Sequence, residues 1–202
     1  MAPRPGQRVL DLCAAPGIKT GQLATALGSG LLIAADVSAR RLRTAAKLHQ
    51  LKMPAIANTH WVRLDATREL AFGTTFARVL VDAPCSGTGT MARNPEIKWR
   101  LQSNDLLRLA HIQEQILRRA LKVLAPDGRL VYSTCSLEPE ENEQVVAKVM
   151  ARAPGCGLLT RELLSVEFPE LSPLFDAQGY FCTRPDLHAM DGFFAAVITR
   201  VG

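Results

Sequence analysis

Two of the five cysteines directly follow apolar, strand-like runs and precede small polar residues. Cys85 stands in VDAPCSGTG (81–89), and Cys135 stands in LVYSTCSLEPEEN (130–142). A lone cysteine is usually a buried packing residue. The other three take that interpretation: Cys13, Cys156 and Cys182. A thiol just past a strand end faces the ligand crevice of an open α/β sheet, so Cys85 and Cys135 are candidate reactive groups.

Two neighbouring thiols suit the methylation of a poor carbon nucleophile. C5 of a pyrimidine does not attack a sulfonium unaided, whereas addition of a thiolate to C6 makes C5 enamine-like. Removal of the C5 proton and β-elimination then free the product. Asp82 could bond to the N3/N4 edge of such a base. A redox pair and a metal site are the alternatives, but redox motifs use closer spacing and no histidine lies nearby in sequence; we expect no metal.

A turn of small residues, DLCAAPGIKT (11–20), follows the first strand-like run. Small side chains let a ligand approach the backbone, and the following helix offers free N–H groups. A phosphate-binding P-loop would need glycine immediately before Lys19, where Ile18 stands, and the dinucleotide motif G-x-G-x-x-G is absent. The turn therefore matches neither of these two nucleotide-binding motifs.

Acidic residues end the second, third and fourth predicted strands: Asp36, Asp65 and Asp82. Asp36 lies about twenty residues past the turn, where an acid commonly holds a ribose diol. S-adenosylmethionine fits the set, because its ribose hydroxyls, adenine amine and ammonium group all prefer acidic partners. A single aspartate at a strand end is often only a cap or turn residue, so the prediction depends on the three together.

Strand-like and helical stretches alternate along the chain. Strands are predicted at 8–13, 31–36, 61–64, 78–83, 129–134 and 193–201, with one short strand among loops at 154–192. Helices are predicted at 19–27, 38–51 with Ser38 as N-cap, 104–124 and 138–153. The strands are mostly apolar throughout, as parallel strands covered on both faces are. The pattern predicts an open, doubly wound α/β sheet that binds ligands at the carboxyl ends of its strands.

The composition indicates a soluble protein of one domain. The chain has 202 residues, 48% of them hydrophobic, and no apolar run approaches the roughly 20 residues of a membrane span. No secretory start is visible, and five cysteines without a C-x-x-C pair suit free cytoplasmic thiols. We expect a cytoplasmic monomer.

Positive charge is concentrated in two places. Residues 88–122 hold seven Lys or Arg against three acids, and a second group lies on the helix predicted at 38–51. Such surfaces suit a polyanion, although the net charge of +5 decides little alone. Trp99, within ARNPEIKWR, is either part of an RNA-binding loop or a packing anchor, and both remain open. His111 and His188 are expected to be structural.

The sequence resembles the Sun/Fmu family of RNA (cytosine-5) methyltransferases. The matching stretches, in the family's order from about residue 6 onward, are VLDLCAAPGIKT, ADVSARRL, VRLDAT, VDAPCSGTGTMARNPEIKWR, LVYSTCSLEPEENEQVV and HAMDGFFAAVITR. The resemblance is strongest to the bacterial branch that acts on small-subunit ribosomal RNA. It implies a Rossmann-like class I methyltransferase domain over 1–202, with a mostly parallel seven-stranded sheet whose last strand is antiparallel. It also implies that the family's upstream RNA-binding segments are absent here.

The resemblance assigns roles to individual residues. Cys135 corresponds to the nucleophile and Cys85 to the residue that assists release of the methylated base. Lys19 would favour the thiolate form of the nucleophile, and Ile18 departs from the family's Gly-Gly-Lys turn. The implied S-adenosylmethionine site consists of Cys13, Ala14, Ala15, Pro16, Gly17, Ile18, Lys19, Asp36, Arg41, Asp65 and Asp82.

Two other functions are weighed against this one. A non-catalytic RNA-binding or ribosome-assembly factor would keep the cofactor pocket as a relic, and the missing upstream segments favour it. The intact pair Cys85 and Cys135 argues against it. A methyltransferase acting on a protein or a small molecule would leave the two cysteines without a role. We therefore expect a methyltransferase that forms 5-methylcytosine in RNA, with ribosomal RNA as its partner.

Overall fold

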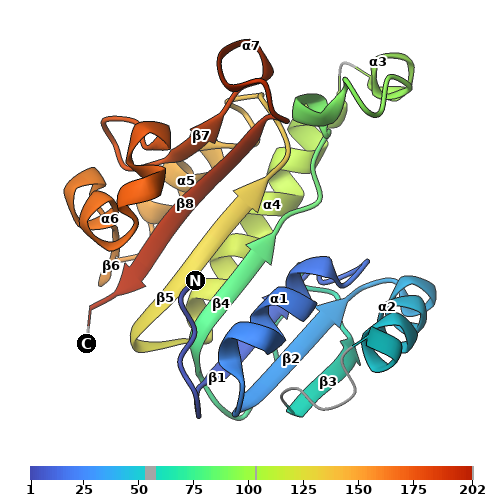
Figure 1. The fold of residues 1–202 in the computed structure, drawn as a ribbon, viewed down its shortest axis with the longest axis vertical. Helices are drawn as coiled ribbons and strands as arrows, with labels where there is room; N and C mark the ends of the chain where they lie inside the picture. The colour runs from blue at the N-terminus through green and yellow to red at the C-terminus, as the bar shows by residue number, and fades with distance from the viewer. Residues whose placement is uncertain (53–57, 103, 202) are drawn as a thin grey trace.

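A twisted sheet with helices on both faces forms the centre of the computed structural model, which describes residues 1–52, 58–102 and 104–201 (Figure 1). The strand order is β3-β2-β1-β4-β5-β8-β6, and β7 pairs with β8. The strands are β1 (Arg8–Leu12), β2 (Leu31–Asp36), β3 (Asn58–Arg63), β4 (Phe76–Asp82), β5 (Leu124–Thr134), β6 (Cys156–Leu158), β7 (Phe181–Thr183) and β8 (Phe193–Arg200). The first five run parallel, and β8 is antiparallel to β5.

The sheet has eight strands within the described residues, so the expected number of seven is wrong by one. Residues 154–192 contribute two short strands, β6 and β7, where a single one was expected. Each has only three residues and pairs antiparallel with β8. Strands this short carry no readable alternation of apolar and polar residues. The predicted antiparallel last strand is confirmed in β8.

The helices lie on opposite faces of the sheet, which confirms the doubly wound arrangement (Figure 1). In that view α1 lies in front of β1 and β2, and α4 lies behind β4 and β5. The helices are α1 (Ile18–Leu27), α2 (Ala39–Lys52), α3 (Ile97–Arg100), α4 (Asp105–Lys122), α5 (Glu143–Met150), α6 (Arg161–Glu167) and α7 (Pro185–His188), with 3₁₀ turns η1 (Thr88–Thr90) and η2 (Pro169–Leu174). No helix among the described residues is long and apolar enough to cross a membrane.

Two helix boundaries differ from the prediction. The helix expected from residue 138 begins only at Glu143, because 138–142 form a turn that points Glu141 and Asn142 into the protein. The helix expected to reach residue 124 ends at Lys122, and β5 already begins at Leu124. The predicted N-cap of α2 is present, since Ser38 Oγ accepts a hydrogen bond from Arg41 N at 3.3 Å.

Apolar side chains fill both sides of the sheet. One cluster lies under α1 and includes Val9, Leu27 and Leu32, which are fully buried. A larger cluster on the other side includes Leu117 of α4 and Val146 of α5. Each fully buried aliphatic side chain contributes roughly 1.5–3 kcal/mol. The packed core therefore fixes the ends of the central strands, where the candidate chemical groups lie.

Candidate active site

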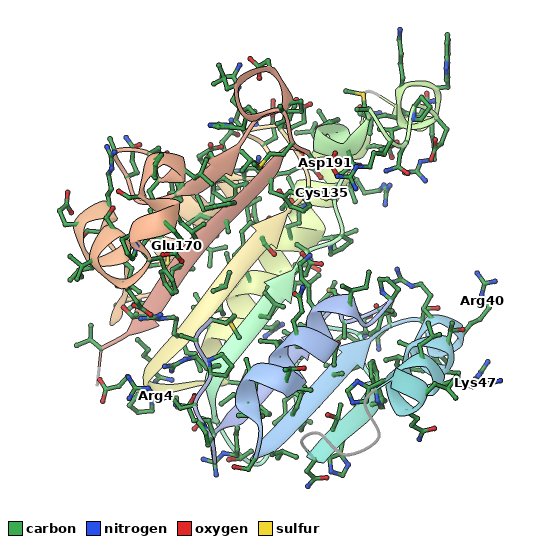
Figure 2. All side chains as sticks on the ribbon, viewed as in Figure 1. Arg4, Arg40, Lys47, Cys135, Glu170 and Asp191 are labelled. Atoms are coloured by element: carbon green, nitrogen blue, oxygen red, sulfur yellow. The ribbon has the colours of Figure 1, made fainter. Side chains whose placement is uncertain are left out.

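The structure brings Cys85 and Cys135 into contact, with 3.3 Å between their Sγ atoms. Each follows the carboxyl end of a strand, β4 or β5, and these two parallel strands are neighbours in the sheet. The register pairs Asp82 with Ser133, so the two strands end at the same level. Both thiols are partly exposed. Figure 2 shows Cys135 at the end of β5 with Asp191 close by.

The two thiols differ in their acidity. The hydrogen bond with Cys135, together with burial, raises the pKa of Cys85. The hydrogen bond from Cys85 lowers the pKa of Cys135 below its ordinary value, against an opposing effect of burial. Lys19 acts on the pKa of Cys135 in the same downward direction, and Asp82 acts against it. Of the two thiols, Cys135 is therefore the one that ionises more readily.

Asp82 is held between two donors beside the thiols. Lys19 Nζ lies 2.6 Å from Asp82 Oδ2, and Ser133 Oγ donates to Asp82 Oδ1 at 2.9 Å. The ammonium group of Lys19 also lies 5.9 Å from the centre of the Phe193 ring. The start of α1 is thereby connected to the carboxyl end of β4.

The turn between β1 and α1 has an unusual backbone. Cys13 has a positive φ of 63°, and Gly17 has a φ of 98°. A Cβ atom at Gly17 would also come within 3.1 Å of Ala45 and 3.2 Å of Trp61, so the turn requires glycine there. Ile18 is 70% exposed, so its bulk points away from the packed interior. Burial raises the pKa of Cys13 to about 12, which agrees with an unreactive thiol.

A cavity of about 210 Å³ lies against this turn. It is lined by Asp11, Cys13, Ala14, Ala15, Pro16, Ile18, Lys19, Gln22 and Asp82. A larger cavity of about 530 Å³ lies between α1 and α2, but no cysteine or carboxylate is among its described lining residues. We place the candidate ligand site at the smaller cavity, because it contains the turn and reaches Asp82 beside the thiols.

Four predicted cofactor residues are not among the described lining residues of this cavity: Gly17, Asp36, Arg41 and Asp65. Asp36 ends β2 and is 3% exposed. It accepts hydrogen bonds from Ala15 N at 3.3 Å and from Arg41 at 2.9 and 3.1 Å. Asp65 instead binds its own turn, accepting from Thr67 N at 3.0 Å and Thr67 Oγ1 at 2.7 Å. Asp36 is thus bonded directly to the turn, whereas Asp65 forms no hydrogen bond to it among the described residues.

Sequence reasoning missed Asp11. This aspartate is fully buried within β1, and burial raises its pKa to about 7. Its Oδ2 accepts from Thr20 Oγ1 at 2.6 Å, while its Oδ1 has no partner among the described residues. An acid in the middle of an apolar strand was the available signal, because an ionisable group is rarely buried there without a purpose.

A second missed group lies behind the thiols. Glu141 is fully buried and accepts hydrogen bonds from Ser86 N at 2.9 Å and Gln113 Nε2 at 2.9 Å. In the sequence it is one of four glutamates between residues 138 and 143. Nothing in the sequence distinguishes it from the exposed acids expected in the first turn of a helix.

A family model described as 16S rRNA methyltransferase RsmB/F matches residues 1–199. The chain belongs to the RsmB/F methyltransferase family. This membership confirms the predicted Sun/Fmu resemblance and the class I methyltransferase fold.

Individual relatives agree with this family. The chain is 40% identical over 159 residues to the ribosomal RNA small subunit methyltransferase B of Cronobacter sakazakii, covering 78% of this chain and 37% of the relative. It is 36% identical over 204 residues to the protein of the same name from Shewanella oneidensis, covering 99% and 44%. The crystal structure of NSun6 from Pyrococcus horikoshii with SFG superposes with a TM-score of 0.82 at 28% identity, covering 99% of this chain and 49% of that one. The chain thus spans about two fifths of the curated relatives it matches.

Trp99 is 81% exposed, which rules out the packing-anchor interpretation. It lies on α3, and Lys98 Nζ stands 5.6 Å from the centre of its ring. In Figure 1, α3 projects beyond the carboxyl ends of β4 and β5. An ion pair of 3.1 Å joins Arg93, just before α3, to Asp191 before β8. This segment of the RsmB/F-family domain therefore presents an aromatic ring and positive charge to solvent.

His111 and His188 have local hydrogen-bond partners. His111 bonds with Gln115 at 2.8 Å, and His188 Nδ1 accepts from Arg184 N at 2.9 Å. Over residues 1–52, 58–102 and 104–201, no three His, Cys, Asp or Glu side chains gather where they could hold a metal ion.

Proposed function

We propose that this RsmB/F-family domain forms 5-methylcytosine in RNA, with S-adenosylmethionine as methyl donor and ribosomal RNA as substrate. The observation that carries the proposal is the 3.3 Å contact between Cys85 and Cys135 at the ends of neighbouring parallel strands. A pair of thiols in contact beside a carboxylate-lined cavity suits covalent activation of a pyrimidine. The family's 16S rRNA description and the names of the curated relatives support ribosomal RNA.

Each thiol has a separate role in this reaction. The thiolate of Cys135 adds to C6 of cytosine, and the electron pair moves to C5, which then takes the methyl group. A base then removes the C5 proton, the electron pair left behind re-forms the C5–C6 double bond, and the bond between sulfur and C6 breaks so that Cys135 leaves as a thiolate. The lowered pKa of Cys135 and the raised pKa of Cys85 support attack by Cys135 and proton transfer involving Cys85. Asp82, fixed by Lys19 and Ser133, is positioned to bind the N3/N4 edge of the base.

The residues around the small cavity fit S-adenosylmethionine. The unpartnered Oδ1 of Asp11 is an acceptor suited to the ammonium group of an amino acid. Asp36 is suited to the ribose hydroxyls, which would take the place of the partly exposed Arg41. The backbone of residues 13–17 would contact the ligand closely, because its side chains are small. The relative solved with SFG, an analogue of S-adenosylmethionine, supports this assignment.

RNA would lie across the carboxyl ends of β4 and β5 and reach α3. The exposed ring of Trp99 suits stacking on a base, and Lys98, Arg93 and Arg100 suit phosphates. The target cytosine would have to leave its stack to reach the partly buried thiols. We further propose that the protein acts as a monomer in the cytoplasm, where its free cysteines stay reduced.

Trapping of a covalent adduct tests the division of roles. Cys85→Ala should accumulate a protein–RNA adduct with 16S ribosomal RNA and S-adenosylmethionine, because attack by Cys135 proceeds and release fails. Cys135→Ala should form none. The adduct is measured as a band of reduced mobility in denaturing electrophoresis that disappears on ribonuclease treatment. Identical behaviour of the two variants would contradict the assignment of Cys135 as nucleophile.

A second test distinguishes the proposed methyltransferase from a non-catalytic RNA-binding protein. Calorimetry measures binding of S-adenosylmethionine, and transfer of a tritiated methyl group to ribosomal RNA measures turnover. A methyltransferase gives both signals, and Cys135→Ala retains binding while losing transfer. RNA binding without cofactor binding or transfer would instead identify an assembly factor.

A further inference from the structure

Glu141 is a buried carboxylate in the turn between β5 and α5. It is fully buried, and no Lys or Arg of the described residues forms an ion pair with it. Its oxygens instead accept from the backbone N–H and the hydroxyl of Ser86 and from the amide of Gln113. Burial of a carboxylate is costly unless such donors surround it. The donors come from segments 28 and 55 residues away, so Glu141 joins distant parts of the chain.

These bonds hold both neighbours of Cys85. Ser86 N donates to Glu141 Oε1 at 2.9 Å on one side. On the other side, Gln113 Nε2 donates both to Glu141 Oε1 at 2.9 Å and to the carbonyl oxygen of Pro84 at 2.8 Å. The position of the Cys85 backbone is therefore set by one carboxylate and one amide.

Asn142, the residue after Glu141, holds both neighbours of Cys135 in the same way. Asn142 Oδ1 accepts from Thr134 Oγ1 at 2.5 Å, and Asn142 Nδ2 donates to the carbonyl oxygen of Ser136 at 2.9 Å. Thr134 and Ser136 are the two neighbours of Cys135. Glu141 and Asn142, adjacent in sequence, thus each fix the segment that carries one of the two thiols.

A chain of hydroxyl groups connects the two segments. A hydroxyl donates one proton, and Ser86 gives its proton to Glu141. Ser136 therefore donates to Ser86 at 3.1 Å, and Thr88 donates to Ser136 at 3.3 Å. Glu141 accepts at the end of this chain and so sets the direction of every bond in it.

We infer that Glu141 and Asn142 are positioning residues that hold Cys85 and Cys135 at the separation needed for covalent catalysis. The catalytic significance rests on the proposed function, whereas the control of the thiol separation does not. Neither residue touches the reacting sulfur atoms. Their effect reaches the thiols through Ser86, Gln113, Thr134 and Ser136.

Disulfide formation measures the separation without RNA or cofactor. Treatment with diamide oxidises two thiols in contact to a disulfide while diamide is reduced to its hydrazine, and peptide mapping identifies the Cys85–Cys135 link among the five cysteines. We expect Glu141→Gln to slow formation of this disulfide about tenfold. The amide NH₂ group of the new glutamine would face the N–H and O–H donors of Ser86 and Gln113, which leaves a buried polar group without a hydrogen bond. Asn142→Asp should slow it similarly, because a carboxylate oxygen would face the carbonyl of Ser136. Glu140→Gln, at a neighbouring glutamate outside this network, is the matched control and should link at the wild-type rate.

Folding is checked by circular dichroism and denaturant titration on each variant. Ser86→Ala keeps the carboxylate and removes only the connecting hydroxyl, so it decides the question if Glu141→Gln fails to fold; it should slow the link several-fold. Wild-type linking rates in folded Glu141→Gln and Asn142→Asp, or in folded Ser86→Ala, would overturn the inference. Slow linking combined with absence of methyl transfer in the wild-type protein would retain the positioning role and reject the proposed function.

Discussion

At the scale of single residues, Asp11 has the clearest linkage between ionisation and stability. Its carboxyl group is fully buried in β1, and burial raises its pKa from 3.8 to about 7. A group with a raised pKa in the folded state binds its proton more tightly there than in the unfolded chain. Its stabilising contribution is complete below about pH 4 and is lost as the pH rises through about 7.

Asp11→Asn should therefore change how stability depends on pH. Between pH 4.5 and pH 8, the stability of the unliganded wild-type protein should fall relative to the variant by up to about 3 kcal/mol, since each unit of pKa shift corresponds to about 1.4 kcal/mol and part of the shift lies below pH 4.5. Urea unfolding at the two pH values measures this difference. Burial lowers the pKa of the Met1 amino group to about 6, so this group makes stability rise with pH. Its effect is the same in both proteins and cancels in the comparison. Parallel pH profiles of the two proteins would exclude Asp11 as the cause.

At the scale of elements, α3 has only four residues, as α7 does, and it buries little. Among its side chains Ile97 is buried, whereas Trp99 is 81% exposed. A tryptophan exposed to solvent beside Lys98 is typical of a binding surface, because its large apolar ring would otherwise be buried. The helix is held to the domain by Ile97 and by the Arg93–Asp191 ion pair.

Trp99→Ala should weaken RNA binding and leave the fold intact. Stacking of a base on an aromatic ring contributes about 1–3 kcal/mol, so we expect a loss of affinity between about 5-fold and 150-fold. Fluorescence anisotropy with a labelled RNA measures the affinity, and calorimetry with S-adenosylmethionine should show no change. Val166→Ala on α6, which alters a side chain that is 83% exposed, is the matched control. Equal RNA affinities for the two variants would remove Trp99 from the interface.

At the scale of the whole molecule, three distant segments meet beside the thiols. Gly89 in η1 donates to the carbonyl oxygen of Cys135 at 3.0 Å, and Gly192 donates to the carbonyl oxygen of Gly89 at 2.8 Å. A Cβ atom on Gly89 would lie only 2.2 Å from Gly192 O. The loop before β8, the turn after β4 and the end of β5 are thus packed backbone against backbone, and only glycine permits this approach.

Gly89→Ala should disrupt this junction. Because backbone atoms must move to admit the methyl group, we expect a loss of about 1–3 kcal/mol in the free energy of unfolding. Methyl transfer should fall further than stability alone explains, since Gly89 is bonded to Cys135. Urea unfolding and the transfer assay measure the two effects. Gly73→Ala, at a glycine with free space around it, should change neither by much; a similar effect at both glycines would point to helix or loop propensity instead.

The sequence by itself determined the order of the elements and the edge of the sheet at which the candidate reactive groups lie. Apolar runs and helical periodicity are local properties, so β2 and the core of α4 lie where they were predicted. The parallel arrangement then brings the carboxyl ends of β4 and β5 to one edge, and with them Cys85 and Cys135. The place of both cysteines after strand-like runs marks them as candidates, and the roles that the family resemblance assigns to them stay predictions.

Only the tertiary structure decided how those groups interact. The 3.3 Å thiol contact joins residues fifty positions apart, and it depends on strand register and on Glu141 and Asn142. The burial of Glu141 and the exposure of Trp99 run against what their residue types suggest, because burial is a property of the packed chain. The short strands β6 and β7 exist because β8 offers them backbone partners. Long-range packing sets these features, and the local sequence carries no signal for it.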